Sequence, residues 1–213
     1  LRGSDLRGAN LDGAQLSDAD LRGADLSSAS LHWANLSESN LSRTSFKGAK
    51  MSLANLYGAN LREANLSNSL LDGANLDDAD LSGTSMNKTR LYGAHLYRAN
   101  LIGANLSGAD LSWAYLYEAI LSDAILDEAF LERAELRRSQ LNGAKLNWTH
   151  LAGANLEAAV LNGAYLFRAD LQGANLQQAN LSGAKLDGAN LSNADLSRAN
   201  LRRAFLYGAN LRG

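Results

Sequence analysis

The sequence predicts an all-β solenoid, a chain wound into stacked coils that turns once every five residues. Leucine occupies every fifth position from Leu1 to Leu211, except at Phe46, Met51 and Met86. The position two before each leucine is always Ala, Ser or Thr, and all 19 glycines lie two residues after this core position. A five-residue period fits neither the 3.6-residue turn of a helix nor the two-residue alternation of a strand. The leucines reach a common interior only if each repeat bends the chain, and stacking then buries them.

The glycine positions predict the kind of bend. A type II turn needs a positive φ at its third residue, and glycine adopts this conformation without a steric cost. Glycine is unevenly distributed over the turns: at positions 18, 38, 58 and onward in steps of twenty to 198, only Gly58 is glycine. We therefore predict that this set of turns mostly avoids the type II conformation.

The small residue of each repeat predicts a narrow interior. Leu and Ala are expected to point inward and the other three residues outward, with Phe46 as the only inward aromatic residue. Inward hydroxyl groups such as those of Thr84 and Thr89 need partners, and nearby backbone carbonyl groups are the expected acceptors. Outward Asn and Asp residues twenty positions apart, such as Asn35 and Asn55, are expected to stack as side-chain ladders.

The repeat resembles the consensus A(D/N)LXX of the pentapeptide-repeat family. Ala104-Asn105-Leu106-Ser107-Gly108 fits it, as do many sister repeats over the whole chain. The resemblance implies a right-handed quadrilateral parallel β-helix with about four pentapeptides per coil. On this basis residues 1–213 are expected to form a single continuous domain. At about 4.8 Å per coil the rod would be roughly 50 Å long.

Composition narrows the classes of function. The chain has 20 basic and 22 acidic residues, so direct nucleic-acid binding is not expected. It has no cysteine, no apolar run that could span a membrane and no signal peptide at its start, and we favour a cytoplasmic location. The histidines, His32, His95 and His150, lie far apart at outward positions, and no serine has a paired base. We therefore expect no enzyme activity, no cofactor, no metal and no small-molecule substrate.

The chain begins and ends within the pattern, at Leu1 and Gly213. A bare end coil exposes unpaired backbone groups and core side chains. We expect flanking segments to cover the ends, with a homodimer or end-to-end packing as the alternative.

The centre of the chain departs most from the repeat. Residues 99–132 contain no Lys or Arg, and the usual Asn or Asp is replaced four times in succession, by Tyr115, Ile120, Ile125 and Phe130. These four should form an apolar ring around the rod. Exposed apolar clusters with charged rims mark protein contacts, in which aromatic residues and arginine dominate the binding energy. The predicted partner-binding residues are Tyr97, Trp113, Tyr115, Tyr117, Ile120, Asp123, Ile125, Asp127, Glu128, Phe130 and Arg137.

Two further groups follow from stacking at twenty residues. One outward column is expected to contain Tyr57, Asp77, Tyr97, Tyr117 and Arg137. A second aromatic patch is predicted on another face near the carboxyl end, comprising Trp148, Tyr165, Phe167, Phe205 and Tyr207. It could bind a partner or receive a capping segment. The simplest alternative for both patches is that outward positions vary freely and bind nothing.

Two functional hypotheses remain. The first is a rigid scaffold without enzyme activity that binds another protein. The second comes from the resemblance, because some pentapeptide-repeat proteins mimic duplex DNA, bind DNA gyrase and protect it from inhibitors. The near-neutral charge disfavours the second, since several arginines would interrupt an acidic track: Arg133, Arg137, Arg138, Arg202 and Arg203.

Overall fold

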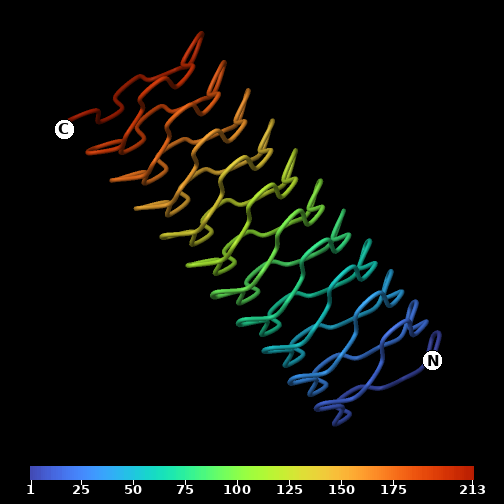
Figure 1. Ribbon diagram of the computed structural model, residues 1–213. Helices are drawn as coiled ribbons and strands as arrows, with labels where there is room; N and C mark the ends of the chain where they lie inside the picture. The colour runs from blue at the N-terminus through green and yellow to red at the C-terminus, as the bar shows by residue number, and fades with distance from the viewer.

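The chain forms a stack of coils with its two termini at opposite ends, in a computed structural model that describes residues 1–213 (Figure 1). It contains no helix and no strand longer than one residue. Each pentapeptide consists of a two-residue turn followed, two residues later, by one residue in a parallel β-bridge. The bridges join residues twenty positions apart, from Asp5–Asp25 to Asn190–Asn210. One coil is therefore twenty residues long and contains four turns. No helix is present that could cross a membrane.

Backbone hydrogen bonds between neighbouring coils hold the stack together, and they follow the same pattern in successive repeats. In the repeat Leu106–Asp110, the N–H of Leu106 donates to the carbonyl of Ile125 at 2.7 Å, and the N–H of Gly108 donates to the carbonyl of Asp127 at 3.0 Å. The N–H of Asp110 donates in the other direction, to Thr89 at 2.9 Å. The N–H of Ala109 closes the turn by donating to the carbonyl of Leu106 at 2.9 Å. Four of the five backbone donors of the repeat are thus used within the backbone.

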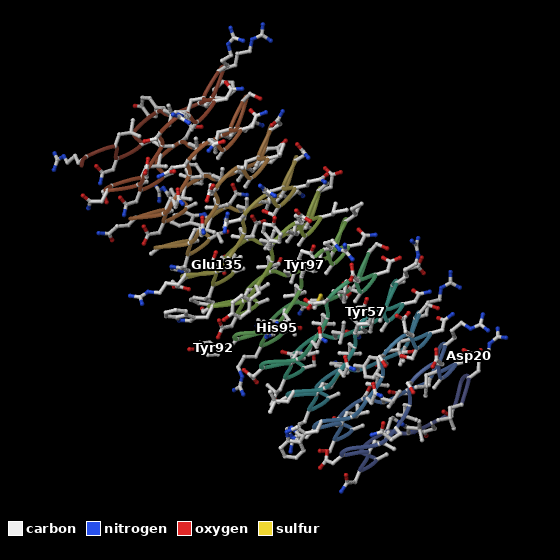
Figure 2. All side chains as sticks on the ribbon, in the orientation of Figure 1. Asp20, Tyr57, Tyr92, His95, Tyr97 and Glu135 are labelled. Carbon is white, nitrogen blue, oxygen red and sulfur yellow. The ribbon has the colours of Figure 1, made fainter.

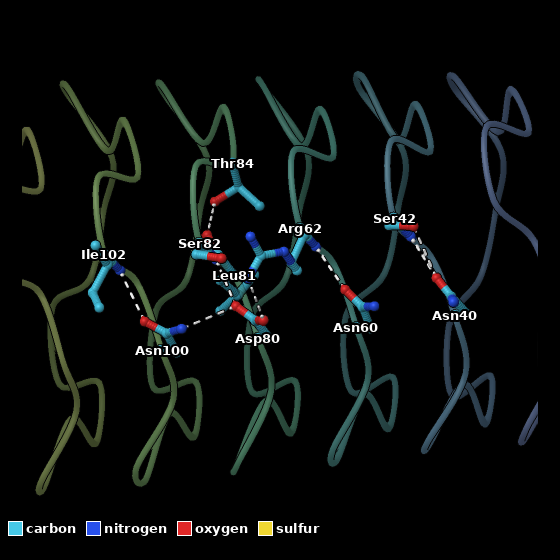
Figure 3. Close-up of polar contacts among 10 residues, drawn as sticks. All are labelled: Asn40, Ser42, Asn60, Arg62, Asp80, Leu81, Ser82, Thr84, Asn100 and Ile102. Atoms are coloured by element: carbon cyan, nitrogen blue, oxygen red, sulfur yellow. Dashed lines mark hydrogen bonds and ion pairs between the residues drawn. The ribbon is translucent and has the colours of Figure 1, made fainter.

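The Asn or Asp of the repeat supplies the acceptor for the fifth donor. Wherever Asn or Asp occupies the bridge position, its Oδ1 accepts the N–H of the residue two positions on, without exception. Figure 3 shows this contact at Asn40, Asn60, Asp80 and Asn100. This role, an Asx turn, was not recognised from the sequence.

The expected side-chain ladders are confirmed. Asn55 Nδ2 donates to Asn35 Oδ1 at 3.2 Å, and Asn75 Nδ2 donates to Asn55 Oδ1 at 3.3 Å. Each of these side chains therefore links two coils and caps a turn at the same time. The preference for Asn or Asp before the leucine follows from both contacts.

The leucines and small residues form one apolar core along the axis. They are buried from Leu21 to Leu191, while their counterparts in the two end coils are only partly buried. Phe46 is fully buried and is the only aromatic residue in the core, as predicted. The inward hydroxyl groups donate to backbone carbonyls as predicted: Thr84 to Leu81 and Thr89 to Leu66, each at 2.7 Å.

The prediction about the glycine-poor turns is wrong. The second turn residue has a positive φ in every repeat, including Asp18 at 56°, Glu38 at 57° and Arg98 at 52°. The same bonds between coils recur at all four turns, so all four adopt the same bend whatever the residue. A residue other than glycine is held in the left-handed region at a cost of roughly 1–3 kcal/mol. Glycine is therefore the low-strain choice at these positions but not a requirement.

Candidate interaction surface

The four residues of the predicted apolar ring, which we call the central belt, leave the coil on different sides. Tyr115, Ile120, Ile125 and Phe130 belong to four separate columns of bridges, which we name after these residues. A turn separates each column from the next, and the stacked turns form an edge of the rod. A flat partner can touch one column and its two flanking edges, but not the whole belt.

The Tyr115 column and its flanking edges carry a cluster of aromatic rings, of which Figure 2 labels Tyr92, His95 and Tyr97. Tyr97 and Tyr117 stack with ring centroids 5.6 Å apart and an interplanar angle of 8°. His95 and Tyr115 pair with centroids 4.9 Å apart at 35°. Trp113 occupies the edge on the other side of Tyr115. We call this cluster the aromatic face, which consists of Tyr92, His95, Tyr97, Trp113, Tyr115 and Tyr117.

Arginine guanidinium groups lie over several of these rings. Arg98 lies 4.9 Å from the ring centroid of Tyr97, and Arg133 lies 5.0 Å from that of Trp113. Arg137 lies 5.9 Å from the centroid of Tyr117. Arginine is favoured for such contacts because its planar, weakly hydrated group stacks on aromatic rings. The edge that contains Tyr97, Tyr117 and Arg137 is the predicted outward column, in which Tyr97 contacts Tyr117 and Tyr117 contacts Arg137.

Hydrogen bonds and ion pairs fix the arginines of this edge. Arg138 Nη1 donates to the Tyr117 hydroxyl at 2.8 Å. Arg98 pairs with Asp78 at 2.6 Å, and this hydrogen-bonded carboxylate raises the pKa of Arg98 above its ordinary value. Arg137 pairs with Glu157 at 3.3 Å. These pairs are substantially exposed, so they contribute little to stability and mainly orient the side chains.

Backbone donors are left free around the belt. In six successive turns the backbone N–H of the first turn residue has no acceptor within the chain. These residues are Tyr117, Ser122, Asp127, Glu132, Arg137 and Asn142. The cause is the sequence itself, because the residues two positions earlier are not Asn or Asp. Elsewhere a missing acceptor is sometimes replaced from the preceding coil, as when Asp77 Oδ1 accepts the N–H of Tyr97 at 2.7 Å. The belt therefore offers outward backbone donors to water or to a partner.

The acidic residues of the predicted set lie away from the aromatic face. Asp127 accepts hydrogen bonds from the backbone N–H and the side-chain Nδ2 of Asn147, both at 2.9 Å. Asp123 extends over Gly143, where an added Cβ would lie 2.6 Å from its Oδ1. Neither of them, nor Glu128, forms an ion pair. Ile120 and Ile125 are half-buried in their own columns.

Phe130 lies beside the second predicted patch. Its ring stacks on His150 with centroids 4.8 Å apart at 4°. It also lines a shallow hollow together with Trp148 and Arg168. Trp148 packs edge-to-face on Phe167 at 5.7 Å. The structure thus groups Phe130 with Trp148 and Phe167, on a side of the rod that does not include Tyr115.

The rest of the second patch follows the Ile125 column toward the carboxyl end. Lys185 Nζ lies 4.1 Å from the ring centroid of Tyr165, and Phe205 follows in the next coil. Tyr207 is almost fully exposed on the neighbouring edge. No ring pair connects Phe205 or Tyr207 to Trp148, so the patch divides into two parts.

Titratable groups are dispersed over the surface. No three His, Asp or Glu side chains gather where they could hold a metal ion. Each histidine lies against an aromatic ring instead: His32 against Trp33, His95 against Tyr115 and His150 against Phe130.

Sequence reasoning missed Tyr92, Arg98, Arg133 and Arg138 as members or neighbours of the aromatic face. Their positions follow from counting in twenties, since Arg133 lies one coil beyond Trp113 and Arg98 adjoins Tyr97. The contacts themselves depend on side-chain conformations, which a periodic count does not give.

Comparisons with known proteins identify the family. The family model for pentapeptide repeats matches residues 1–27, 24–62, 59–97, 94–133, 114–151, 144–183 and 174–213. HetL, a pentapeptide repeat protein involved in heterocyst differentiation regulation from the cyanobacterium Nostoc sp. strain PCC 7120, is 38% identical; the match covers 97% of this chain and 89% of HetL, with a TM-score of 0.37.

Two further solved structures are more distant. A pentapeptide repeat protein from the Arabidopsis thaliana thylakoid lumen is 28% identical over 52% of this chain and 67% of its own, with a TM-score of 0.34. Full-length QnrB1, a plasmid-mediated fluoroquinolone resistance protein, is 17% identical over 97% of this chain and 91% of its own, with a TM-score of 0.33. A search of curated proteins gave no match. The chain belongs to the pentapeptide-repeat family, which implies a right-handed β-helix.

Proposed function

We propose that this chain is a rigid, non-enzymatic scaffold that binds a partner protein through the aromatic face. We further propose that residues 1–213 form one continuous unit with the quadrilateral cross-section of the family. The observation that carries the proposed function is the gathering of Tyr97, Trp113, Tyr115 and Tyr117 around one column, with arginines over three of the four rings. Of the predicted site, these residues and Arg137 form the proposed contact.

The geometry suits tight binding at low entropic cost. Aromatic side chains have few rotatable bonds, and stacking and hydrogen bonds already restrict the rings of Tyr97 and Tyr117. The backbone beneath them is held by hydrogen bonds in every repeat. A partner would therefore order few side chains on this surface as it binds, which leaves more of the contact energy for affinity.

A quantitative pull-down tests the proposal. The immobilised chain is exposed to a lysate of the source organism, and the retained proteins are measured by mass spectrometry. Tyr117→Ser should weaken retention of the specific partner by about thirtyfold or more, the equivalent of a 2 kcal/mol hot spot. Tyr207→Ser, which removes an exposed tyrosine on another edge, should leave it unchanged. Equal retention by both variants would contradict the proposed site.

Duplex-DNA mimicry has a different signature. Acidic and basic side chains alternate along the edges, as in the pairs of Arg98 with Asp78 and Arg138 with Glu118. A mimic needs a continuous acidic track to compete for a basic groove. Direct binding to DNA gyrase, lost when Asp123, Asp127 and Glu128 are changed to Lys, would favour mimicry over scaffolding.

A further inference from the structure

Large apolar side chains occupy four of five successive turns along one edge of the rod. This edge lies between the Phe130 and Tyr115 columns, and we call it the Trp113 edge. Along it, Trp33 is 64% exposed, Leu53 56%, Tyr92 50% and Trp113 48%. The one turn of the five without a large apolar side chain is Asp72-Gly73. Leu53 extends over Gly73, where an added Cβ would meet its Cδ2 at 2.8 Å, whereas the space at Gly93 is open. The result is an apolar strip with a notch.

Stability does not explain the presence of these residues, because their backbone conformation is strained. Trp33, Leu53 and Trp113 have φ values of 56°, 59° and 60°, in the left-handed region where bulky residues are rare. Glycine would relieve the strain, and the exposed side chains gain little by burial. Among turn residues of positive φ, the only other large apolar residue is Trp148, on a different edge. Three of the four such residues thus lie on one edge.

Unpaired positive charge lies alongside the strip. Lys50 is exposed in the Phe130 column, immediately before the turn that contains Leu53. Lys47 and Lys88 are exposed on the next edge beyond that column. None of the three forms an ion pair, whereas Arg90 in the same column is held by Asp72 at 2.6 Å. Carboxylates of a partner are the charges that would complement this flank.

We propose that the Trp113 edge binds an amphipathic α-helix of a partner protein, parallel to the rod, with acidic residues on the flank that faces Lys50. Coils repeat every ~4.8 Å and helical turns every ~5.4 Å, so each turn can place one apolar residue against each coil with little drift over four turns. The distance from Trp33 to Trp113 is four coils, about 19 Å, which matches about 13 helical residues. This inference rests on the proposed function, because Trp113 also belongs to the aromatic face.

A designed peptide provides a defined probe. It has about 18 residues, apolar side chains once per helical turn and Glu along one flank, and its binding is measured by fluorescence anisotropy at low salt. Leu53→Gly and Trp33→Gly should each weaken binding at least tenfold while leaving the fold intact, because glycine relieves the strain at these turns. Trp148→Gly makes the same change on another edge and should leave binding unchanged. Replacement of Glu by Lys in the peptide should also weaken binding at least tenfold.

The outcomes separate this inference from the proposed function. Failure of the peptide to bind, equal binding by Leu53→Gly, or equal binding of the Lys peptide would each overturn the helix proposal. Loss of peptide binding in Tyr117→Ser but not in Leu53→Gly would do the same, and would leave the aromatic face as a contact site. The pull-down with Tyr117→Ser tests the proposed function independently of the peptide.

Discussion

Ala104→Leu should destabilise the protein by overfilling the interior. Ala104 is fully buried, and equivalent small residues lie one coil away on either side, at about 4.8 Å. Carbon atoms pack at about 3.5–4.0 Å, so three additional carbons have no free space between the coils. Five hydrogen bonds between coils, 2.7–3.1 Å long, involve residues 103–106. Separating the coils would weaken about three of them, at about 1 kcal/mol each, in addition to the packing strain.

We therefore expect a loss of about 3–5 kcal/mol and a fall in melting temperature of roughly 6–20 °C. Denaturant unfolding and thermal melting, both followed by circular dichroism, measure these changes. Ala152→Leu is the matched control, since Ala152 occupies an outward turn position and its change should stay within about 0.5 kcal/mol. An Ala104→Leu protein as stable as the Ala152→Leu protein would refute the narrow core.

Three further predictions concern hydrogen bonds at the surface. Asn60→Ala removes the acceptor of a turn N–H and should cost about 1 kcal/mol in denaturant unfolding, whereas Gln140→Ala, at a bridge position without this bond, should cost less. The backbone N–H of Ser107 donates to Asn105 Oδ1, whereas that of Ser122 has no acceptor in the chain. Hydrogen exchange followed by NMR should therefore be faster at Ser122 than at Ser107, and equal rates would contradict the free N–H at Ser122. The hydrogen-bonded guanidinium of Arg7 lowers the pKa of Asp5 to about 2. The contribution of Asp5 to the stability of the first coil should be present above about pH 4 and lost as the pH falls toward 2. NMR titration of this carboxyl group checks the lowered pKa.

The inside and outside of the rod could be predicted from the sequence because one physical constraint acts at every repeat. A narrow core accepts only a leucine-sized side chain and a small one in each quintet, so the period itself identifies the buried positions. The same constraint explains why Phe46 and the hydroxyl groups of Thr84 and Thr89 were placed correctly.

Features that depend on local geometry could not be predicted in this way. Glycine frequency suggested a different bend at Asp18 and its equivalents, but bonds between coils impose one bend everywhere. The Asx turn was missed because the period shows where Asn recurs, not which donor it meets. The central belt was expected as one ring, yet the turns direct Tyr115 and Phe130 to different sides, where they join different clusters.

Cysteine accessibility tests the central claim most directly, since the chain has no cysteine of its own. Single substitutions Asn105→Cys, Leu106→Cys and Ser107→Cys sample one bridge, one core and one turn position of the same repeat. Under native conditions we expect Asn105→Cys and Ser107→Cys to react readily with a thiol reagent, and Leu106→Cys to react only as fast as unfolding exposes it. Equal reactivity at all three positions in the folded protein would contradict an inward leucine and, with it, the placement of every outward residue.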